Sequence, residues 1–285
     1  MCQFCTAHGE GKKWYLQMHN YSQELYQAEL TAGQQAAASS RSRSEWMGKF
    51  FESFVLPATG KVKLPEDAHS EPQGPKLSEE EILHQSQMVH FGQVLPIEDV
   101  KAVLNIASSI TRVPCGCRYL NTGLANQRYC FGVGYDFSGL LGRYPEAASS
   151  LEVLEKEEAL KIMRKFDDEG LMHSIWTGMT PYVVGICNCD HDCGAYKWYI
   201  EKNGRPNFFR AEYVCQVDRD RCIGCKECMS QCQFGAQFYS SANEKVYISP
   251  EKCFGCGVCR AACAQDAIRL IPRQSIPEAA NLWLR

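Results

Sequence analysis

The chain has 285 residues, of which 45% are hydrophobic and 22% charged, and its formal net charge is −3. This length predicts two or three domains with a sizeable core. A net negative charge gives no electrostatic attraction to nucleic acid or to an anionic membrane surface. No apolar run reaches the roughly 20 residues of a membrane helix, and the N-terminus lacks the pattern of a secretory signal. We therefore expect a soluble, cytoplasmic protein that neither spans a membrane nor binds nucleic acid.

Cysteine is the unusual component of this composition. The chain contains 17 cysteines, an odd number, and many of them are only two or three residues apart. In a small secreted chain such a content would predict disulfides. Neighbouring thiols on one tight loop suit a metal centre better, because thiolates are soft ligands that favour iron–sulfur clusters, zinc or copper(I).

The first region, residues 1–56, is predicted to be helical. Apolar residues recur at helical spacing in two stripes, and Ser42 with Glu45 forms a capping box ahead of the second; the stripes are Trp14, Met18, Tyr21, Leu25 and Ala28, then Met47, Phe50, Phe51 and Phe54. We interpret this region as a docking element, with packing into a core as the open alternative. Four prolines among polar residues predict a linker or extended arm over residues 57–76.

Residues 77–215 are predicted to form a small, cysteine-rich mixed α/β domain. Ser78 and Glu81 form a second capping box, and Pro96 is expected to open a helix. A second helix is expected to end before Gly170. Tyr182–Cys187 is rich enough in β-branched residues for a strand. The order of helix, glycine and short strands favours a winged-helix-like arrangement.

An internal repeat follows in residues 216–273, ahead of a short tail at 274–285. Four cysteines at spacings of two, two and three residues recur 31 residues later; they are Cys222, Cys225, Cys228 and Cys232, then Cys253, Cys256, Cys259 and Cys263. A cubane cluster needs four converging thiolates, and two-residue gaps let one loop supply three of them. In this pattern the fourth cysteine ligates the other cluster. The first [4Fe–4S] cluster is therefore assigned to Cys222, Cys225, Cys228 and Cys263, and the second to Cys253, Cys256, Cys259 and Cys232.

This repeat resembles the bacterial two-cluster ferredoxins. Gly224 and Gly255 fit the loop, where the backbone must approach the cluster closely, and Ala236 and Ala267 fit a small position after the fourth cysteine. The departure is at Gln233 and Ala264, where the family usually has proline. The alternative of zinc sites is disfavoured, because four-cysteine zinc sites more often pair two C-x2-C units across a longer loop. The resemblance predicts an α+β chain that ends in a two-[4Fe–4S] ferredoxin-like domain.

A third metal centre is a hypothesis for the cysteines upstream. Cys115 with Cys117, and Cys187 with Cys189, alternate so that both thiols of a pair share one side if the backbone is extended, and Cys193 follows closely. These five residues form either a third metal centre, iron–sulfur or zinc, or a set of buried free thiols, and the N-terminus suggests a second further centre. Cys2, Cys5 and His8 suggest half of another site, with an exposed terminus as the alternative.

The remaining catalytic motifs are missing. There is no Walker loop, no dinucleotide-binding glycine pattern after a strand and no Gly-x-Ser-x-Gly, so no catalytic residue is assigned. Together with the repeat, three segments resemble uncharacterised ferredoxin-domain proteins of anaerobic bacteria; they are Val113–Arg118, Glu169–His173 and Ile186–Cys193. The resemblance implies anaerobic redox metabolism.

These features favour an electron-transfer subunit that passes single electrons between the catalytic and electron-donor subunits of a larger oxidoreductase. Residues 216–273 contain eight Lys or Arg and six Asp or Glu, which favours stable docking over the steering of an acidic free ferredoxin. One alternative is an oxidoreductase with its own catalytic metal centre in residues 77–215. Another is a cluster-bearing regulator that uses the winged-helix-like segment on DNA.

Overall fold

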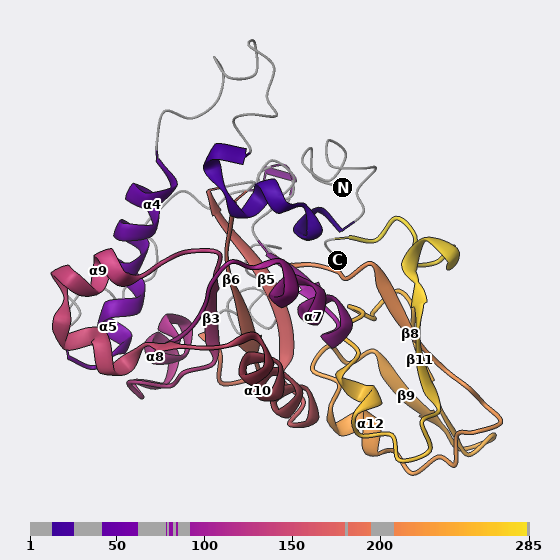
Figure 1. Cartoon of the computed structure of the whole chain (residues 1–285). Helices are drawn as coiled ribbons and strands as arrows, with labels where there is room; N and C mark the ends of the chain where they lie inside the picture. Colours follow the sequence, from indigo (N-terminus) through magenta and orange to yellow (C-terminus); the bar gives the residue numbers. More distant parts are fainter. Residues whose placement is uncertain are drawn as a thin grey trace.

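The computed structural model of the chain describes residues 13–25, 42–61, 92–179, 182–194 and 208–283, and the single positions 78, 80, 81 and 84. Helices and mainly antiparallel sheets form it (Figure 1), as the α+β prediction requires. Within these ranges no helix combines the length and the apolar character that crossing a membrane requires.

A seven-stranded sheet forms the body of the chain. Its strand order is β4-β2-β3-β6-β5-β1-β7, and neighbours are antiparallel except β1 and β7, which are parallel. The strands are β1 (Gly92–Leu95), β2 (Ile110–Val113), β3 (Cys130–Val133), β4 (Glu152–Val153), β5 (Met172–Met179), β6 (Tyr182–Cys189) and β7 (Phe208–Phe209). Strand β6 lies at the centre, so both of its edges are paired, and most of its residues are buried.

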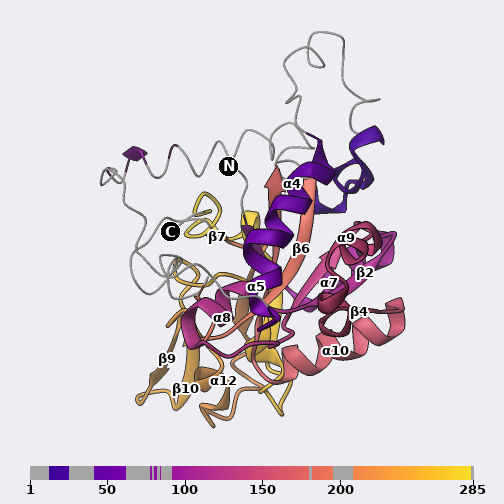
Figure 2. The ribbon, with the colours of Figure 1, turned by 90° about the vertical axis from the view of Figure 1, so that its left-hand side faces the viewer.

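The two faces of the sheet support two separate apolar cores. Successive residues of a strand point to opposite faces, so Leu95 and Val183 belong to one core and Val94 and Val184 to the other. Helices α7 (Ile97–Ile106) and α10 (Lys156–Asp168) cover the first face, while α4 (Arg43–Phe50), α5 (Leu56–Ala58) and α9 (Ser138–Arg143) cover the second. Figure 2 shows α4 and α5 on one side of β6, with α7 and α10 on the other.

The helices predicted within residues 77–215 are confirmed. Helix α7 starts directly after Pro96 and buries Val100, Val103 and Leu104 against the sheet. Helix α10 is followed by Gly170, whose φ of 82° is the left-handed conformation that glycine adopts at a helix C-terminus. The winged-helix-like arrangement stays a prediction.

The N-terminal region differs from the predicted helix. Trp14–Leu16 and Met18–Tyr21 are two short 3-10 turns, separated by an extended Gln17. The indole of Trp14 and the ring of Tyr15 are buried in the first core, whereas Met18 is 63% exposed. Side-chain hydrogen bonds to backbone carbonyls, from Asn20 to Trp14 and from Tyr21 to Tyr15, hold these turns. The described parts of the region, residues 13–25 and 42–56, therefore pack into the two cores, which is the alternative to docking.

The capping box ahead of α4 is confirmed, because Ser42 and Glu45 exchange side-chain and backbone hydrogen bonds. The helix continues through a π-helical turn, Phe51–Val55, into α5. Pro57, Ala58 and Thr59 are buried, so the predicted arm at 57–76 begins inside the fold; residues 62–76 lie outside the described ranges.

The repeat folds as a separate ferredoxin-like unit at the edge of the molecule (Figure 1). Strand β8 (Tyr213–Val217) pairs with β11 (Ile268–Pro272), and β9 (Gln237–Ser240) pairs with β10 (Lys245–Ile248). Short helical turns α12 (Glu227–Ser230) and η7 (Val258–Arg260) follow the two cysteine loops. Because β8 crosses the expected boundary at 215/216, the unit begins by Tyr213. The predicted tail packs back: Trp283 is 9% exposed and belongs to the first core.

Buried Gln93 on β1 links three parts of the chain. Its carbonyl oxygen accepts a hydrogen bond from the Trp14 indole at 2.6 Å. Its amide donates to the carbonyl oxygen of Arg210 and to the Glu212 carboxylate, both at 3.2 Å. Burial raises the pKa of Glu212 to about 7, so this carboxyl holds a proton more tightly in the folded chain than in the unfolded one.

Glu212 should make stability fall as pH rises. Its folded pKa lies above the ordinary value of 4.5, so between these pH values the folded state binds more protons than the unfolded state and loses stability with increasing pH. Glu212→Gln should remove this loss. Its free energy of unfolding should exceed that of the wild type by on the order of 2 kcal/mol at pH 7.5, with little difference near pH 5. Denaturant unfolding of both proteins across this range measures it. A constant difference at all pH values would contradict it.

Candidate metal centres

The two cysteine loops of the ferredoxin-like unit have the same backbone geometry. Gly224 and Gly255, 31 residues apart, have φ values of 71° and 75°. A Cβ atom would lie 2.1 Å from the carbonyl oxygen of Glu244 at the first, and 2.0 Å from that of Tyr213 at the second. Only glycine suits both this backbone conformation and this close approach. Each loop is thus wrapped tightly against a neighbouring strand or turn, as a cubane-binding loop requires.

The two halves of the repeat exchange their fourth cysteines. The thiol of Cys232 accepts a hydrogen bond from the backbone of Ala236, and that of Cys263 from Ala267, both at 3.3 Å. The backbones of the halves pair crosswise: Asp218 donates to the carbonyl oxygen of Ala267, and Ser249 to that of Ala236. This pairing carries each fourth cysteine to the opposite loop.

One pocket of the unit, which we call site 1, is lined by residues that belong to neither core of the sheet. Four thiols line it, namely those of Cys222, Cys225, Cys228 and Cys263. Burial, and then the nearby Cys263 thiol, raise the pKa of Cys228 to about 11. Cys225 is exposed, and the neighbouring Ile223 is 64% exposed. A cluster held here would lie close to solvent.

A second pocket, which we call site 2, faces the body of the chain. Its thiols are those of Cys253, Cys256, Cys259 and Cys232, and a fifth comes from Cys215 on β8. The backbone N–H of Cys215 donates to the Cys253 sulfur at 3.3 Å. Burial raises the pKa of Cys256 to about 12. Sequence reasoning gave Cys215 no role, because it lies outside the repeated spacing.

Site 2 lies against the seven-stranded sheet. The stacked rings of Phe234 and Phe254, whose centroids are 4.1 Å apart, pack into the second core together with Cys256. The Gln233 amide donates to the carbonyl oxygens of Gly170 and Cys189, at 2.7 and 3.2 Å. These residues flank the cysteines, so the contact fixes site 2 relative to the sheet.

An ion pair further along the contact joins the two parts of the chain. Arg260, which follows Cys259, forms two hydrogen bonds with the Glu98 carboxylate of α7, at 2.7 and 2.8 Å. This paired geometry is the strongest form of arginine–carboxylate contact. It holds the ferredoxin-like unit against the first face as well.

Two buried arginines contact the site 2 loop. Arg273, which is 0% exposed, donates to the carbonyl oxygen of Cys253 at 2.9 Å. Arg210, which is 4% exposed, donates to the same oxygen at 3.3 Å and lies over the ring of Phe254. Burial lowers the pKa of each guanidinium to about 10, so both remain charged at neutral pH.

Six further thiols gather beside the second core, and we call them the six-thiol group; they are Cys115, Cys117, Cys130, Cys187, Cys189 and Cys193. The sequence predicted five of these, and the structure brings all five together. It adds Cys130 on β3, which lies opposite Cys187 on β6 with the two sulfurs 3.6 Å apart. Cys130 stands alone in the sequence, and only the register of the two strands reveals it.

Cys193 lies at the centre of the six-thiol group. Its sulfur is 3.3 Å from that of Cys189, and the thiols of Cys115 and Cys117 also contact it. Cys189 ends β6, Cys193 follows a tight turn, and Cys115 caps helix α8 (Gly116–Thr122). Contact with the Cys193 thiol, and then burial, raise the pKa of Cys117 and of Cys189. Cys2, Cys5 and His8 lie outside the described residues.

The thiols are not arranged around single points. Among the described residues, no three His, Cys, Asp or Glu side chains are placed to hold one metal ion, and this applies to sites 1 and 2 as much as to the six-thiol group. A cubane takes its four thiolates on separate iron corners, so the thiolates converge on the whole cluster and not on one ion.

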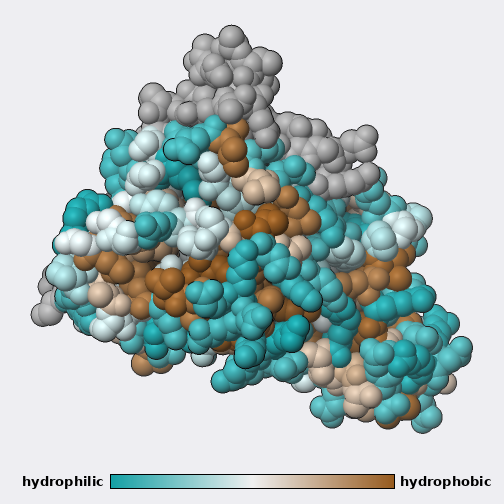
Figure 3. Space-filling model, in the orientation of Figure 1, coloured by the Kyte–Doolittle hydropathy of each residue, from teal (hydrophilic) through white to brown (hydrophobic). Residues whose placement is uncertain are grey.

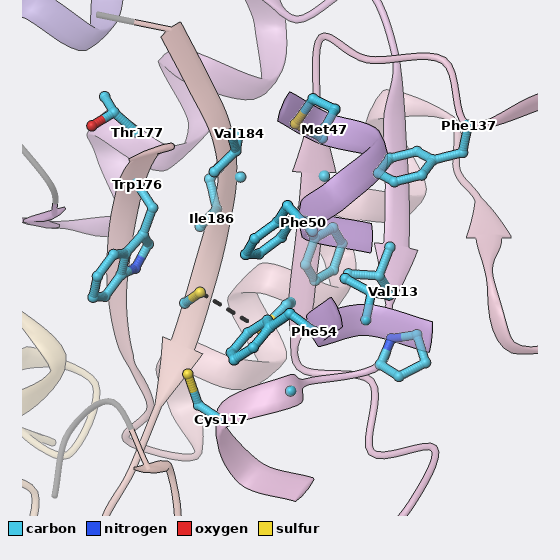
Figure 4. A pocket seen from close by; sticks show the side chains of 18 of the residues that line it. Met47, Phe50, Phe54, Val113, Cys117, Phe137, Trp176, Thr177, Val184 and Ile186 are labelled. Atoms are coloured by element: carbon cyan, nitrogen blue, oxygen red, sulfur yellow. Dashed lines mark hydrogen bonds between the residues drawn. The ribbon is translucent and has the colours of Figure 1, made fainter. Parts of the chain in front are cut away.

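An apolar cavity of about 340 Å³ adjoins the six-thiol group. Cys117, Cys130 and Cys187 form part of its wall, and the rest is almost entirely hydrophobic. Figure 4 shows the ring of Trp176 on one side and those of Phe50 and Phe54 on the other, with the Cys117 thiol pointing into the space between. Cavities of this size and character accept small uncharged molecules.

The buried arginines should raise the reduction potential of a cluster bound at site 2. A reduced cluster carries one more negative charge, which the buried Arg273 cation stabilises. Arg273→Gln should therefore lower the potential of the cluster at site 2 by roughly tens of millivolts, whereas Arg273→Lys should keep it near the wild-type value. Redox titration followed by electron paramagnetic resonance measures both. Equal shifts in the two variants would show that packing, not charge, is responsible.

Comparison with known proteins agrees with the geometry of the repeat. Residues 221–267 match the family model described as a 4Fe-4S dicluster domain. Neither the curated proteins nor the solved structures include a significant match to the chain. The part of the chain that contains sites 1 and 2 is thus an iron–sulfur domain of ferredoxin type, and this supports iron–sulfur electron transfer in general.

Proposed function

We propose that this chain is an electron-transfer subunit of a larger, anaerobic oxidoreductase complex in the cytoplasm, and that it passes single electrons between redox partners. The observation that carries the proposal is the placement of two four-thiol sites in one unit, one near solvent and one against the body of the chain. Clusters with four cysteine ligands leave no iron open to substrate. Their chemistry is then the movement of one electron at a time.

The ligand sets in this proposal are crossed. Cys222, Cys225, Cys228 and Cys263 hold one [4Fe–4S] cluster at site 1, and Cys253, Cys256, Cys259 and Cys232 hold the other at site 2. The lining of the two pockets supports this division. When bound, the clusters would supply two one-electron carriers, each held by thiols from both halves of the repeat.

The surroundings of the two sites support a route for electrons along the molecule. Site 1 has an exposed cysteine and an exposed apolar side chain beside it, Cys225 and Ile223. In Figure 3 the surface of the ferredoxin-like unit, at the lower right, is largely hydrophilic with small apolar areas. Site 2 instead contacts the sheet through Gln233 and Phe254. A partner protein would exchange electrons at site 1, and site 2 would connect to the body of the chain.

A second candidate is an enzyme whose own catalytic centre lies in residues 77–215. The apolar cavity beside Cys117, Cys130 and Cys187 favours it, because a small uncharged molecule bound there would lie next to thiols. Such an enzyme would need a metal with an exchangeable ligand. For the third candidate, a DNA-binding regulator, no contact or charge pattern among the described residues offers support.

The crossed ligation predicts which cluster a substitution alters. Cys263→Ser should change the spectrum of the cluster held by Cys222, Cys225 and Cys228, because Cys263 lines site 1 and not its neighbour in the sequence. Cys232→Ser is the matched variant and should change the other cluster. Electron paramagnetic resonance of the two reduced variants distinguishes the signals. The reverse assignment would refute the crossed sets.

The relay itself is tested by electron exchange with the redox partner that co-purifies from the native host. Ile223→Lys should slow the second-order electron exchange by roughly tenfold. This factor corresponds to the loss of about 1.4 kcal/mol of apolar contact with the partner. Val153→Lys is the control, because Val153 is 76% exposed and lies on the edge strand β4 away from both sites. Stopped-flow absorbance of the clusters gives the rates.

Two outcomes would count against the relay. Equal rates in wild type, Ile223→Lys and Val153→Lys would mean that no partner docks at site 1. Sustained turnover of a small uncharged acceptor by the isolated chain would favour the enzyme instead.

A further inference from the structure

We infer that the six-thiol group holds a third iron–sulfur centre, a four-iron cubane whose ligands are Cys115, Cys117, Cys189 and Cys193. The inference rests on the proposed function, which it extends by one carrier within the body of the chain.

Thiols from separate segments meet around Cys193. The sulfur of Cys189 is 3.3 Å away, and those of Cys115 and Cys117, about 75 residues earlier, are also in contact with it. Buried free cysteines are common as single small apolar residues, but packing alone does not require thiols from distant segments to contact one another. Four thiolates around one volume are what a cubane needs.

The second pair of thiols lies beside this set. Cys130 and Cys187 contact each other at 3.6 Å on paired strands and face the apolar cavity. Cys117 also faces the cavity, but its thiol contacts that of Cys193. The contacts of the pair are instead with each other and, for Cys130, with Cys115. We therefore assign these two thiols to the wall between the centre and the cavity rather than to the ligand set.

Charge around the group suits an anionic centre. A cluster with four thiolates carries net negative charge, and burying charge requires a partner. Arg118, only 5% exposed, follows Cys117 and lies within electrostatic range of Cys115 and Cys193. The Asp190 carboxylate and the face of the Tyr129 ring hold its guanidinium in place, at 2.8 and 4.1 Å.

A cluster is preferred to a mononuclear zinc ion because of the neighbouring sites. Sites 1 and 2 each gather four cysteine thiols without the arrangement around one point that zinc requires, and residues 221–267 match a dicluster domain. The six-thiol group likewise gathers cysteine thiols, and it lies against site 2. Zinc is the alternative outcome of the metal analysis.

The position of the group continues the line of carriers. The Cys189 carbonyl oxygen accepts a hydrogen bond from Gln233 at 3.2 Å, and Gln233 directly follows Cys232 of site 2. Phe234 and Phe254 pack into the same core as Cys189 and Cys193. One electron can thus pass between site 2 and the third centre with no bond made or broken, one cluster being oxidised as the other is reduced.

Iron, sulfide and zinc analysis of the full chain, purified anaerobically, tests the inference without an activity assay. We expect about twelve iron and twelve sulfide per chain in the wild type and about eight of each in Cys193→Ser, since each cubane contains four. Cys187→Ser is the matched control and should keep about twelve iron and twelve sulfide per chain. Cys189→Ser is a second ligand variant, expected to match Cys193→Ser.

Electron paramagnetic resonance separates the failure of this inference from failure of the proposed function. In Cys193→Ser the signals of sites 1 and 2 should persist, which also shows that the variant folds. About eight irons in the wild type, with those two signals intact, would overturn the third centre and leave the relay in place. Eight irons with one zinc would also overturn it. Loss of iron in Cys187→Ser equal to that in Cys193→Ser would overturn the ligand set.

Discussion

The packing of site 2 against the seven-stranded sheet determines how the parts of this protein relate to one another. Gln233 donates to carbonyl oxygens of the sheet domain, and Phe234 and Phe254 extend its second core. Arg260 adds a paired ion contact to α7. Without this contact the ferredoxin-like unit would be a free carrier with both ends in solvent. With it, one end is fixed and the other remains exposed.

The same contact explains why two charged arginines are buried beside site 2. Arg210 and Arg273 donate to the Cys253 carbonyl oxygen from strands and loops that also meet Glu212 and Gln93. Buried cations beside a cluster stabilise its reduced form, whereas site 1, near solvent, lacks such burial. The two sites of the repeat therefore lie in different electrostatic surroundings, which would set the order in which clusters bound there are reduced.

Two departures from the sequence-based expectation are explained by contacts with distant residues. The predicted N-terminal helix is two 3-10 turns, because Trp14 and Tyr15 are anchored by Gln93 and Asp99. The position where related ferredoxins usually have proline holds Gln233, and its amide reaches the sheet. Proline lacks this donor. A residue that seemed only a departure from the family pattern thus makes the contact between the unit and the body.

Local spacing in the sequence was enough to find the eight-cysteine repeat, its glycines and the helices α4, α7 and α10. A ligand loop, a capping box and an amphipathic stripe each depend on residues within a few positions of one another. The gathering of the thiols was a hypothesis from the sequence for Cys115 and Cys193, and for Cys130 with Cys187 it could not be read in that way. It depends on strand register and on the turn after β6, which long-range packing decides because only the paired strands bring distant thiols together.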